Sequence, residues 1–417
     1  MHICIFQTGE PLHIDEGYYR PMRAMLLTNK LLENGHKVTL ISSTFFHQRK
    51  VFRHKTQKSI KINDNFDIHL IPSIGYKNHI GFKRILDHII LAFNLHFFLR
   101  KNKKFYPERV FVGYPPIETS FVMIMWCMSK RIPIILDVKD NWPENFIEAF
   151  PKFLKPISYL ILFPYFLLAK FIFKKATKIT TITKPFVKWV KFMSGEKEET
   201  NILKNKFFIS PLVRKPILIN KKNLESCSTF WSNLNVNIFD KKHFSFIGSL
   251  TKSFDFNFIY QSALYLSNYY PDYKFIICGS GDQYEVINKL FCKLNNIVLL
   301  NEINQYQAKL LIANSIATLA PYKNTSNFQN SIPNKVIESI ENQVPFITTI
   351  DGELKKLIDK NNNGVYIPNT KKENLVIYLK LIENKKYLNL LKKNAYQSYI
   401  DLFSFDKVFD NILRNII

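Results

Sequence analysis

Short apolar runs alternate with helix-forming stretches along this chain, and this alternation most limits how the chain can fold. The runs in the first half lie at 2–8, 36–43, 66–74, 109–115, 131–140 and 178–186. Those in the second half lie at 243–250, 273–278, 296–303, 316–322, 344–349 and 364–369. Strands that alternate with helices form parallel, doubly wound sheets. We therefore expect an α/β fold with functional residues at the carboxyl ends of the strands.

The chain is long enough for two hydrophobic cores. It has 417 residues, of which 47% are hydrophobic, and single cores seldom grow beyond roughly 250–300 residues. A polar stretch at 221–237 follows the first series of runs. We predict one Rossmann-like domain over residues 1–205, a second over 206–395, and a C-terminal helix over 396–417.

The chain is strongly basic, with a formal net charge of +25, and its first half carries the larger share of that charge. A basic, aromatic-rich surface suits an anionic partner, either lipid or nucleic acid. The sequence has no helix-turn-helix, zinc-finger or ribonucleoprotein signature. We therefore expect an anionic membrane surface as a partner and no nucleic acid.

The cysteines predict neither a metal site nor a disulfide framework, because the 5 cysteines are scattered and form no C-x-x-C pair. The chain begins on an apolar run without a basic-then-apolar leader. This favours a cytoplasmic location.

Two segments are candidates for contact with a membrane. Residues 82–100 mix apolar side chains with lysine and arginine, and residues 152–175 are more apolar and flanked by lysine. The uncharged part of the second segment, from Pro156 to Ala169, is shorter than the roughly 20 residues that a transmembrane helix needs, and Pro164 interrupts it. A helix lying in one leaflet fits better. A packing helix of the first domain is the alternative, and it stays open.

Residues 330–347 indicate a tight turn, a short helix and a buried strand. Ser331 is suited to cap the helix and Pro333 to occupy its first turn. Free amide groups at a helix start bind anions, so a diphosphate would fit there. Glu338 follows Lys335 by one helical turn and can hold a ribose hydroxyl pair. An ordinary capped surface helix is the alternative reading of these residues.

The same segment resembles the nucleotide-sugar-binding segment of glycosyltransferase family 4, through P-N-K-x-x-E-S and the following V-P-F-I-T-T. The family consists of retaining enzymes of the GT-B fold. The resemblance implies two domains facing across a cleft, with the acceptor on the first and the nucleotide sugar on the second. It implies that Glu338 contacts the donor ribose. Many members carry a second acid where this chain has Asn330, a departure that matches a bacterial surface-polysaccharide branch.

Further donor-binding residues are implied by the order of motifs in the second half. Gly248 would approach the donor phosphates, and Lys252 would contact the diphosphate because Ser249 stands where many members have arginine. The G-x-G motif would be formed by Gly279 and Gly281, although a plain turn is an equal alternative. Glu302 lies where the backbone of family members commonly contacts the base of the nucleotide. Tyr322 lies at the end of another expected strand. The remaining donor-binding candidates are Asn330, Ser331, Pro333 and Lys335.

In the first half, residues 137–144 resemble the D-x-R-D-x-W-P segment of the polysaccharide branch. Asp140 would lie near the transferred sugar, and capping the next turn is its alternative role. Candidate acceptor-binding residues follow the first strand or precede the first helix: Gly9, Gly17, Tyr19 and Arg20. Arg20 can equally be a solvated charge at the helix entry. We assign Asp140, Glu338 and Lys252 to catalysis and name no nucleophile, since transfer in this fold is usually described as front-face attack.

These features together predict a retaining glycosyltransferase of the hexosyl or N-acetylhexosaminyl type. The donor is a nucleotide-diphosphate sugar, with a UDP-sugar favoured, and the acceptor is lipid-linked or a polysaccharide of the bacterial surface, such as capsule or O-antigen. We expect no cofactor and no metal, because the chain lacks a D-x-D motif, and a peripheral place on the inner face of the cell membrane. The alternatives are a GT-B nucleotide-sugar 2-epimerase and a non-enzymatic basic protein that binds lipid or nucleic acid.

Overall fold

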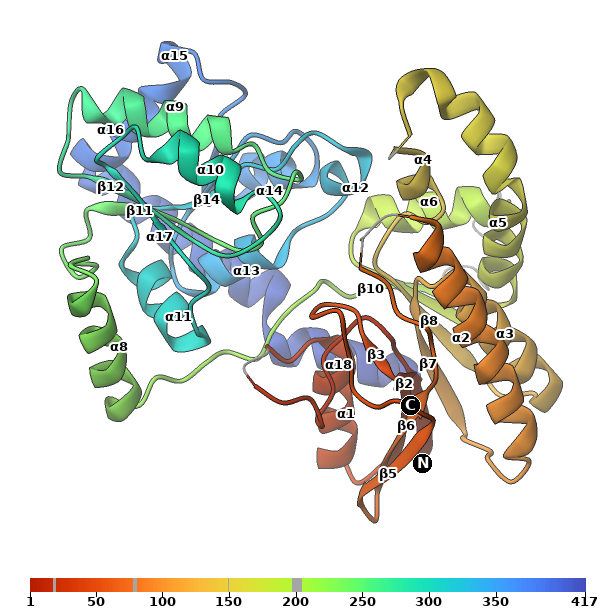
Figure 1. Ribbon diagram of the computed structural model, residues 1–417. Coiled ribbons are helices and arrows are strands. Elements are labelled where there is room, and N and C mark those ends of the chain that lie inside the picture. The colour runs from red at the N-terminus through yellow and green to blue at the C-terminus, as the bar shows by residue number, and fades with distance from the viewer. Residues whose placement is uncertain (18–19, 78–80, 149, 197–204) are drawn as a thin grey trace. The chain divides into compact units, whose positions relative to one another are not determined.

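The computed structural model describes residues 1–417 except 18–19, 78–80, 149 and 197–204. The chain forms two compact units (Figure 1). The first comprises Met1–Pro211 together with Asp406–Ile417, and the second comprises Leu212–Phe405. The first unit therefore extends a few residues past the predicted boundary at 205, because a short strand at Phe207–Ile209 joins its sheet.

The first unit is built on an eight-stranded sheet in the order β10-β9-β8-β7-β1-β2-β6-β5. Its strands are β1 (His2–Phe6), β2 (Lys37–Ser43), β5 (Lys58–Asn63), β6 (Phe66–Ile71), β7 (Arg109–Tyr114), β8 (Ile134–Val138), β9 (Lys178–Thr181) and β10 (Phe207–Ile209). All neighbours pair in parallel except β5 and β6. The central strands are almost wholly buried, as is typical of a parallel sheet covered on both faces.

The antiparallel edge strand β5 was not expected from the sequence. Its residues are mostly exposed and include two lysines, so they lack the apolar run that marks the other strands. Lysine on an edge strand discourages pairing with another chain. The small hairpin of β3 (Phe45–Phe46) and β4 (Val51–Phe52) was also not expected, because each strand is only two residues long.

Helices cover the sheet of the first unit (Figure 1). They are α1 (Arg23–Glu33), α2 (Phe82–Lys101), α3 (Ile117–Lys130), α4 (Glu144–Glu148), η1 (Lys152–Leu154), α5 (Lys155–Lys175), α6 (Lys184–Ser194) and α18 (Phe405–Ile416). Helices α2, α3, α5 and α6 pack side by side in that order.

Helix α18 belongs to the first unit although it ends the chain. It buries Phe409 and Ile412 completely or nearly so. The Asn411 side chain donates a hydrogen bond of 3.2 Å to the carbonyl of Ile209, and Lys178 donates one of 3.2 Å to Asn415. The predicted helix over 396–417 is interrupted, because a π-helical turn at Tyr399–Phe403 separates α18 from the helix before it.

The second unit contains a fully parallel sheet in the order β13-β12-β11-β14-β15-β16. Its strands are β11 (His243–Ile247), β12 (Lys274–Cys278), β13 (Ile297–Leu300), β14 (Thr318–Ala320), β15 (Phe346–Thr348) and β16 (Gly364–Tyr366). Its helices are α8 (Lys221–Asn233), α9 (Phe256–Ser267), α10 (Tyr284–Phe291), α11 (Gln305–Asn314), α12 (Ser326–Gln329), α13 (Asn334–Glu341), α14 (Glu353–Asn361), α15 (Lys372–Leu375), α16 (Ile377–Glu383) and α17 (Lys385–Ser398). The order and type of these strands agree with the sequence expectation.

Candidate functional site

Helix α13 begins at Asn334, with Pro333 as its N-cap. The expectation that Ser331 caps the helix was wrong, because the Ser331 hydroxyl donates instead to the carbonyl of Phe328, at 3.4 Å. Pro333 likewise precedes the first turn rather than lying inside it. Its φ of −69° and ψ of 150° are extended, and a proline ring accepts that φ at either position. The first amides of α13 have no partner within the helix, as at any helix start.

Lys335 lies in the first turn of α13 with its amino group turned inward. The Nζ atom is 3.8 Å from the ring centroid of Phe246 and 3.9 Å from that of Phe254. It is shielded from solvent and has no hydrogen-bond partner. Burial lowers the pKa of Lys335 to about 7, and the negative charge of Glu338 opposes this shift. The aromatic faces around the amino group favour its charged form, whereas burial disfavours it.

Glu338 projects from the same helix and forms an ion pair. Its Oε1 atom lies 2.7 Å from Nη1 of Arg214, and both side chains are mostly buried. Arg214 stands in the segment that opens the second unit, before α8. Sequence reasoning missed it, since basic residues are frequent there and no motif distinguishes this one.

Two glycine turns meet beside Lys335, at the ends of β11 and β12. The amide of Leu250 donates to the carbonyl of Ser280 at 2.7 Å. Gly281 has a φ of +158°, and a Cβ there would lie only 2.9 Å from the backbone nitrogen of Leu250. Gly248 has a φ of +154°, and a Cβ there would lie 3.0 Å from Nζ of Lys335. The close approach of the Leu250 backbone therefore requires glycine at 281, and the positive φ favours glycine at 248.

The other predicted donor residues are spread over neighbouring strand ends. Gly279 follows β12 and donates its amide to Leu300, at 3.1 Å. Ser280 donates a hydrogen bond to the carboxylate of Glu302 beyond β13. Tyr322, after β14, is buried and contacts the Phe254 ring at 4.6 Å rather than standing open. Glu302, Ser249 and Lys252 are exposed, and Asn330 is half-buried.

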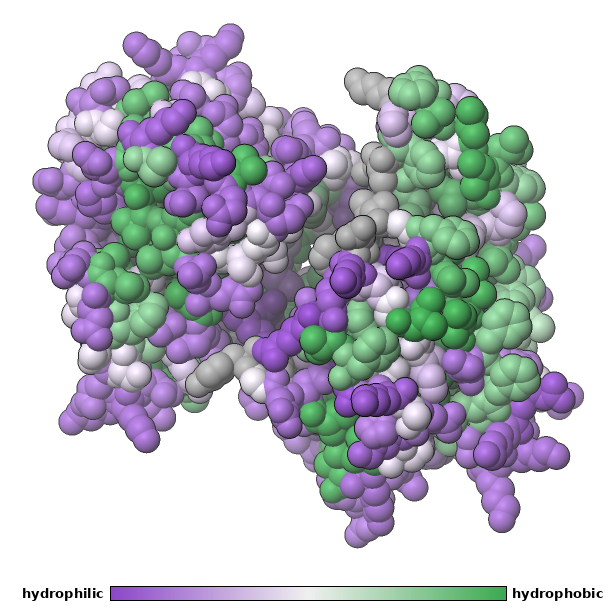
Figure 2. Space-filling view, viewed as in Figure 1, coloured by the Kyte–Doolittle hydropathy of each residue, from purple (hydrophilic) through white to green (hydrophobic). Residues whose placement is uncertain are grey.

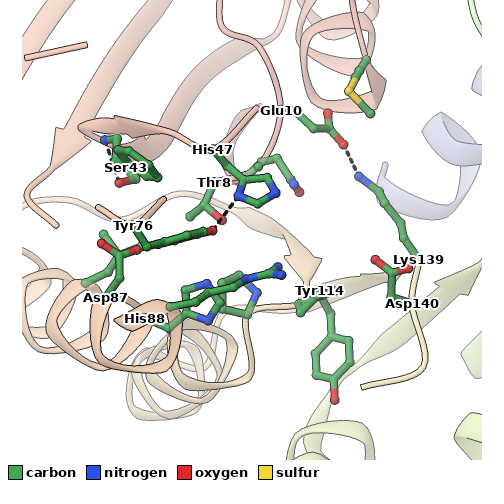
Figure 3. A pocket seen from close by; sticks show the side chains of 18 residues that line it. Thr8, Glu10, Ser43, His47, Tyr76, Asp87, His88, Tyr114, Lys139 and Asp140 are labelled. Atoms are coloured by element: carbon green, nitrogen blue, oxygen red, sulfur yellow. Dashed lines mark hydrogen bonds and ion pairs between the residues drawn. The ribbon is translucent and has the colours of Figure 1, made fainter. Parts of the chain in front are cut away.

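The first unit contains a cavity of about 200 Å³ at the carboxyl ends of its strands (Figure 3). Gly9 after β1 and Asp140 after β8 both line it, as does Lys139. The cavity is also lined by residues from the end of β2 and the segment after it, from the segment between β6 and α2, and from α2 itself. The sequence did not connect these residues with the site: Ser43, His47, Tyr76, Arg84, Asp87 and His88. The structure thus places the predicted residues Gly9 and Asp140 in one cavity with polar side chains from distant parts of the sequence.

A histidine in this cavity has a defined tautomer. The Nδ1 atom of His47 lies 2.6 Å from the Tyr76 hydroxyl and 3.1 Å from Nζ of Lys50. An ammonium group can only donate, so Nδ1 accepts and the neutral ring carries its proton on Nε2. Burial raises the pKa of Tyr76 to about 12, so its hydroxyl keeps its proton. The Nε2 atom of His47 can therefore donate a hydrogen bond.

Two buried groups in or beside the cavity have charged forms that burial disfavours. Burial lowers the pKa of His88 to about 3, and this ring lies 5.8 Å from that of Trp142. Burial raises the pKa of Glu118, whose Oε1 atom accepts a hydrogen bond of 2.7 Å from Tyr165 on α5. His88 therefore lines the cavity as a neutral ring.

A buried charge network fixes the β1 and β8 ends of the cavity. Asp137 on β8 pairs with Arg23 of α1 and lies 3.2 Å from Lys139. Lys139 also pairs with Glu10. The other carboxylate oxygen of Glu10 accepts the Ala24 amide at 2.7 Å, at the start of α1. Glu10 therefore serves as a distant cap for α1 while it neutralises Lys139.

Gly17 and Arg20 are not among the residues that line this cavity. Gly17 has a φ of +83° and lies against the guanidinium of Arg49, which donates to the carbonyl of Glu16 at 2.8 Å. Arg20 is half-buried and is not among the cavity-lining residues. Tyr19 lies outside the described residues. Within the described part of the chain, no group of three or more His, Cys, Asp or Glu residues could hold a metal ion.

An apolar surface covers part of the first unit. Figure 2 shows hydrophobic residues gathered over the region where Figure 1 draws α5 and α2. Helix α5 is long and apolar enough to cross a membrane by length and composition alone, and only 28% of its most apolar window is buried. Leu160 and Phe163 are 76% and 56% exposed, and Pro164 lies inside the helix.

Comparison with known proteins agrees with this architecture. Residues 233–398 match the family model for Glycosyl transferases group 1. Sucrose-phosphate synthase from Thermosynechococcus elongatus is structurally similar, with a TM-score of 0.68 at 10% identity, over 99% of this chain and 97% of that one. No curated protein matches the chain.

Two further solved structures resemble the whole chain. HepE from Anabaena, in complex with UDP and glucose, has a TM-score of 0.65 at 10% identity, over 99% of this chain and 98% of its own. WaaG, a glycosyltransferase involved in lipopolysaccharide biosynthesis, has a TM-score of 0.62 at 14% identity. The match covers 100% of this chain and 99% of WaaG. The chain thus has the GT-B fold, and the part that carries Lys335 and Glu338 matches the group 1 glycosyl transferases.

Proposed function

We propose that this protein is a retaining glycosyltransferase that takes a sugar from a nucleotide-diphosphate donor, with UDP-sugars favoured. The observation that carries the proposal is the grouping of a buried cation, a carboxylate and two glycine turns around the start of α13. The cation and the helix start suit a diphosphate, and the carboxylate of Glu338 suits a ribose diol. This grouping lies within the segment that matches the group 1 family.

The acceptor is held by the first unit, in the cavity beside Gly9 and Asp140. Its walls combine aromatic rings with donors and acceptors, a mixture suited to a sugar ring bearing hydroxyl groups. We assign Asp140 to an acceptor or donor sugar hydroxyl near the anomeric carbon. The bond between the anomeric carbon and the diphosphate oxygen breaks, and the bond to the acceptor oxygen forms on the same face. The proton of the acceptor hydroxyl passes to the leaving diphosphate, so the configuration is retained without a covalent enzyme intermediate. The chemistry needs no cofactor, since Lys335, Lys252 and backbone amides can stabilise the leaving charge.

The acceptor is lipid-linked or a growing polysaccharide in bacterial surface-glycan synthesis, and the protein binds peripherally to the cytoplasmic face of the membrane. The support for this part is the exposed apolar face of α5 with lysine at both ends. Cationic side chains near anionic lipid contribute about 1 kcal/mol each.

The proposal is tested by a nucleotide screen followed by mutation. A UDP-sugar present at 100 times its dissociation constant adds about 2.7 kcal/mol of stability, which a thermal-shift assay detects. Glu338→Ala is expected to weaken donor binding by about 1.5–3 kcal/mol, because charge-assisted hydrogen bonds to the ribose are lost. Absence of a shift with every UDP-, GDP- and dTDP-sugar would exclude a glycosyltransferase.

The two alternatives give different results in the same assays. A 2-epimerase converts the free nucleotide sugar without any acceptor, whereas a transferase releases nucleotide only when an acceptor or water takes the sugar. A non-enzymatic lipid-binding or nucleic-acid-binding protein keeps its binding in Glu338→Ala. The exposed apolar face of α5 favours the transferase, since an enzyme acting on a free nucleotide sugar has no use for it.

A further inference from the structure

Lys335 reverses the usual arrangement of a lysine side chain. Lysines normally bury their methylene stem and keep the ammonium group in water. Here the residue as a whole is half-buried, yet its Nζ atom is shielded and has no hydrogen-bond partner. An ammonium group without such partners is costly to bury. A fold that keeps one in place calls for a functional reason.

Three elements surround this amino group. Phe246 of β11 and Phe254 of the following loop lie within 4 Å of it, and the Tyr322 ring at the end of β14 lies at 5.3 Å. The backbone turn at Gly248 is a further neighbour, since a Cβ there would lie 3.0 Å from Nζ. The amino group therefore lies against the turn at which the donor diphosphate is expected.

We infer that Lys335 is a direct cationic ligand of the donor diphosphate, and that donor binding is accompanied by uptake of a proton on its amino group. This inference rests on the proposed function. It goes further by coupling the uptake of one proton to donor binding. The proton comes from solvent, it adds to the lone pair of the neutral amine, and no covalent bond of the donor breaks.

The groups that face Lys335 explain why its protonation should respond to the ligand. Burial dominates and lowers its pKa to about 7, while the charge of Glu338 on the same helix acts in the opposite direction. Arg214 already pairs with the Glu338 carboxylate. Burial raises the pKa of Tyr322, which stays a neutral phenol. The other neighbours, two phenyl rings and Gly248, do not titrate, so an arriving diphosphate is the strongest new charge.

The sign of the pH dependence follows from these facts. The diphosphate favours the charged amine, so the pKa of Lys335 is higher in the complex than in the free protein. Donor affinity is then full below pH 7 and falls as the pH rises above the free pKa. The fall approaches tenfold per pH unit until the pKa of the complex is reached.

Calorimetric titration with UDP at pH 8, in two buffers of different ionisation enthalpy, measures the protons taken up. The wild-type protein is expected to take up close to one proton per UDP. Lys335→Met is expected to take up none and to bind UDP at least tenfold more weakly. The phosphate of UDP itself titrates near pH 6, and its small contribution at pH 8 is the same for each variant.

Two controls separate a ligand from a structural residue. Lys356→Met, on the exposed face of α14, should retain both affinity and proton uptake. Lys335→Met should keep or raise the thermal midpoint, because methionine fills the aromatic site without a buried charge; a structural role would lower it. UDP binding without proton uptake by the wild-type protein, or equal uptake in Lys335→Met, overturns the inference but leaves donor binding intact. Failure of UDP, GDP and dTDP all to bind overturns the proposed function as well.

Discussion

Arg214 and Glu338 meet through one carboxylate oxygen, at 2.7 Å. This contact orients the carboxylate that we assign to the ribose hydroxyls. A guanidinium fork holds a carboxylate in a fixed orientation, which a lysine does not. We therefore regard Arg214 as a positioning residue for Glu338.

Arg214→Ala is expected to weaken UDP binding about tenfold, equivalent to about 1.4 kcal/mol. The effect should shrink towards none for UDP lacking both ribose hydroxyls, because such a ligand makes no use of an oriented carboxylate. Arg214→Lys should fall between these values. Binding constants from calorimetry decide the matter: an equal loss for both ligands would assign Arg214 to the phosphates or to folding.

His88 gives a prediction for stability at low pH. Its pKa is about 3 in the folded protein, against an ordinary value of 6.5. The unfolded chain therefore binds the proton first, so the stabilising contribution is complete above pH 6.5 and is lost as the pH falls towards 3. In this range the free energy of unfolding falls by about 1.4 kcal/mol for each pH unit.

His88→Asn should consequently show a thermal midpoint that falls less steeply than the wild-type midpoint between pH 6.5 and 4.5. Burial raises the pKa of Glu118, which acts in the opposite direction, but that group is present in both proteins. His96→Asn, at an exposed position of α2, is the matched control. Parallel curves for wild type and His88→Asn would show that the ring is not neutral in the folded state.

At the scale of elements, α5 has two distinct sides. Leu162, Ala169, Ile172 and Phe173 are buried, and Tyr165 bonds to Glu118 of α3. The opposite side carries large apolar residues that contact little else. Both expectations for residues 152–175 thus have a counterpart in the structure, since one side packs on the unit and the other faces outward.

The double substitution Leu160→Ser with Phe163→Ser should weaken binding to vesicles containing phosphatidylglycerol by at least tenfold. Each exposed side chain is worth about 1.5–3 kcal/mol when buried in an apolar phase. The thermal midpoint should stay unchanged, because neither side chain is buried in the protein. Val286→Ser, at an exposed apolar position of α10, serves as the control in the same sedimentation assay. Unaltered vesicle binding would refute a role for this face.

Strands and helices could be predicted from the sequence where the burial of apolar side chains determines them. Strands such as β1, β11 and β12 appear as apolar runs because both faces of a parallel sheet are covered. The edge strand β5 lacks such a run, since its stability comes from backbone pairing with β6. The start of α13 was misplaced because the same φ suits proline as N-cap or in the first turn. The aromatic surroundings of Lys335 come from three separate segments, and no spacing in the sequence records that meeting.

The candidate site was predictable to a different degree in each unit. In the second unit the motif order located the glycine turns and Glu338 at neighbouring strand ends. In the first unit only Gly9 and Asp140 were linked to the cavity, because α2 and the loop after β2 contribute residues without a recognisable pattern. Tertiary contacts over such sequence distances depend on the topology of the sheet rather than on local propensity.

At the scale of the whole molecule, the second unit is inserted in the sequence of the first. Residues 212–405 fold as one body, while Asp406–Ile417 return to the other. The apolar face of α18 completes the core of the first unit, with Ile412 wholly buried. The stability of the first unit therefore depends on residues at both ends of the chain.

Ile412→Ala should lower the thermal midpoint of the first unit, since removing a buried isoleucine side chain costs about 2–5 kcal/mol. UDP should still bind at temperatures below that transition, because the donor residues all lie within 212–405. Arg414→Ala, on the exposed side of the same helix, should leave both transitions in place. Scanning calorimetry with and without UDP distinguishes the two units, and a uniform loss of both transitions would contradict their independence.

Because Asp406–Ile417 belong to the first unit, a label at the C-terminus follows the movement of that unit. A fluorophore attached at Ile417 moves with the first unit, although residues 212–405, which precede its helix in the sequence, belong to the second. Paired with a second dye on α10, it would form a ruler across the two bodies, and energy transfer between the dyes would register any reorientation when nucleotide arrives.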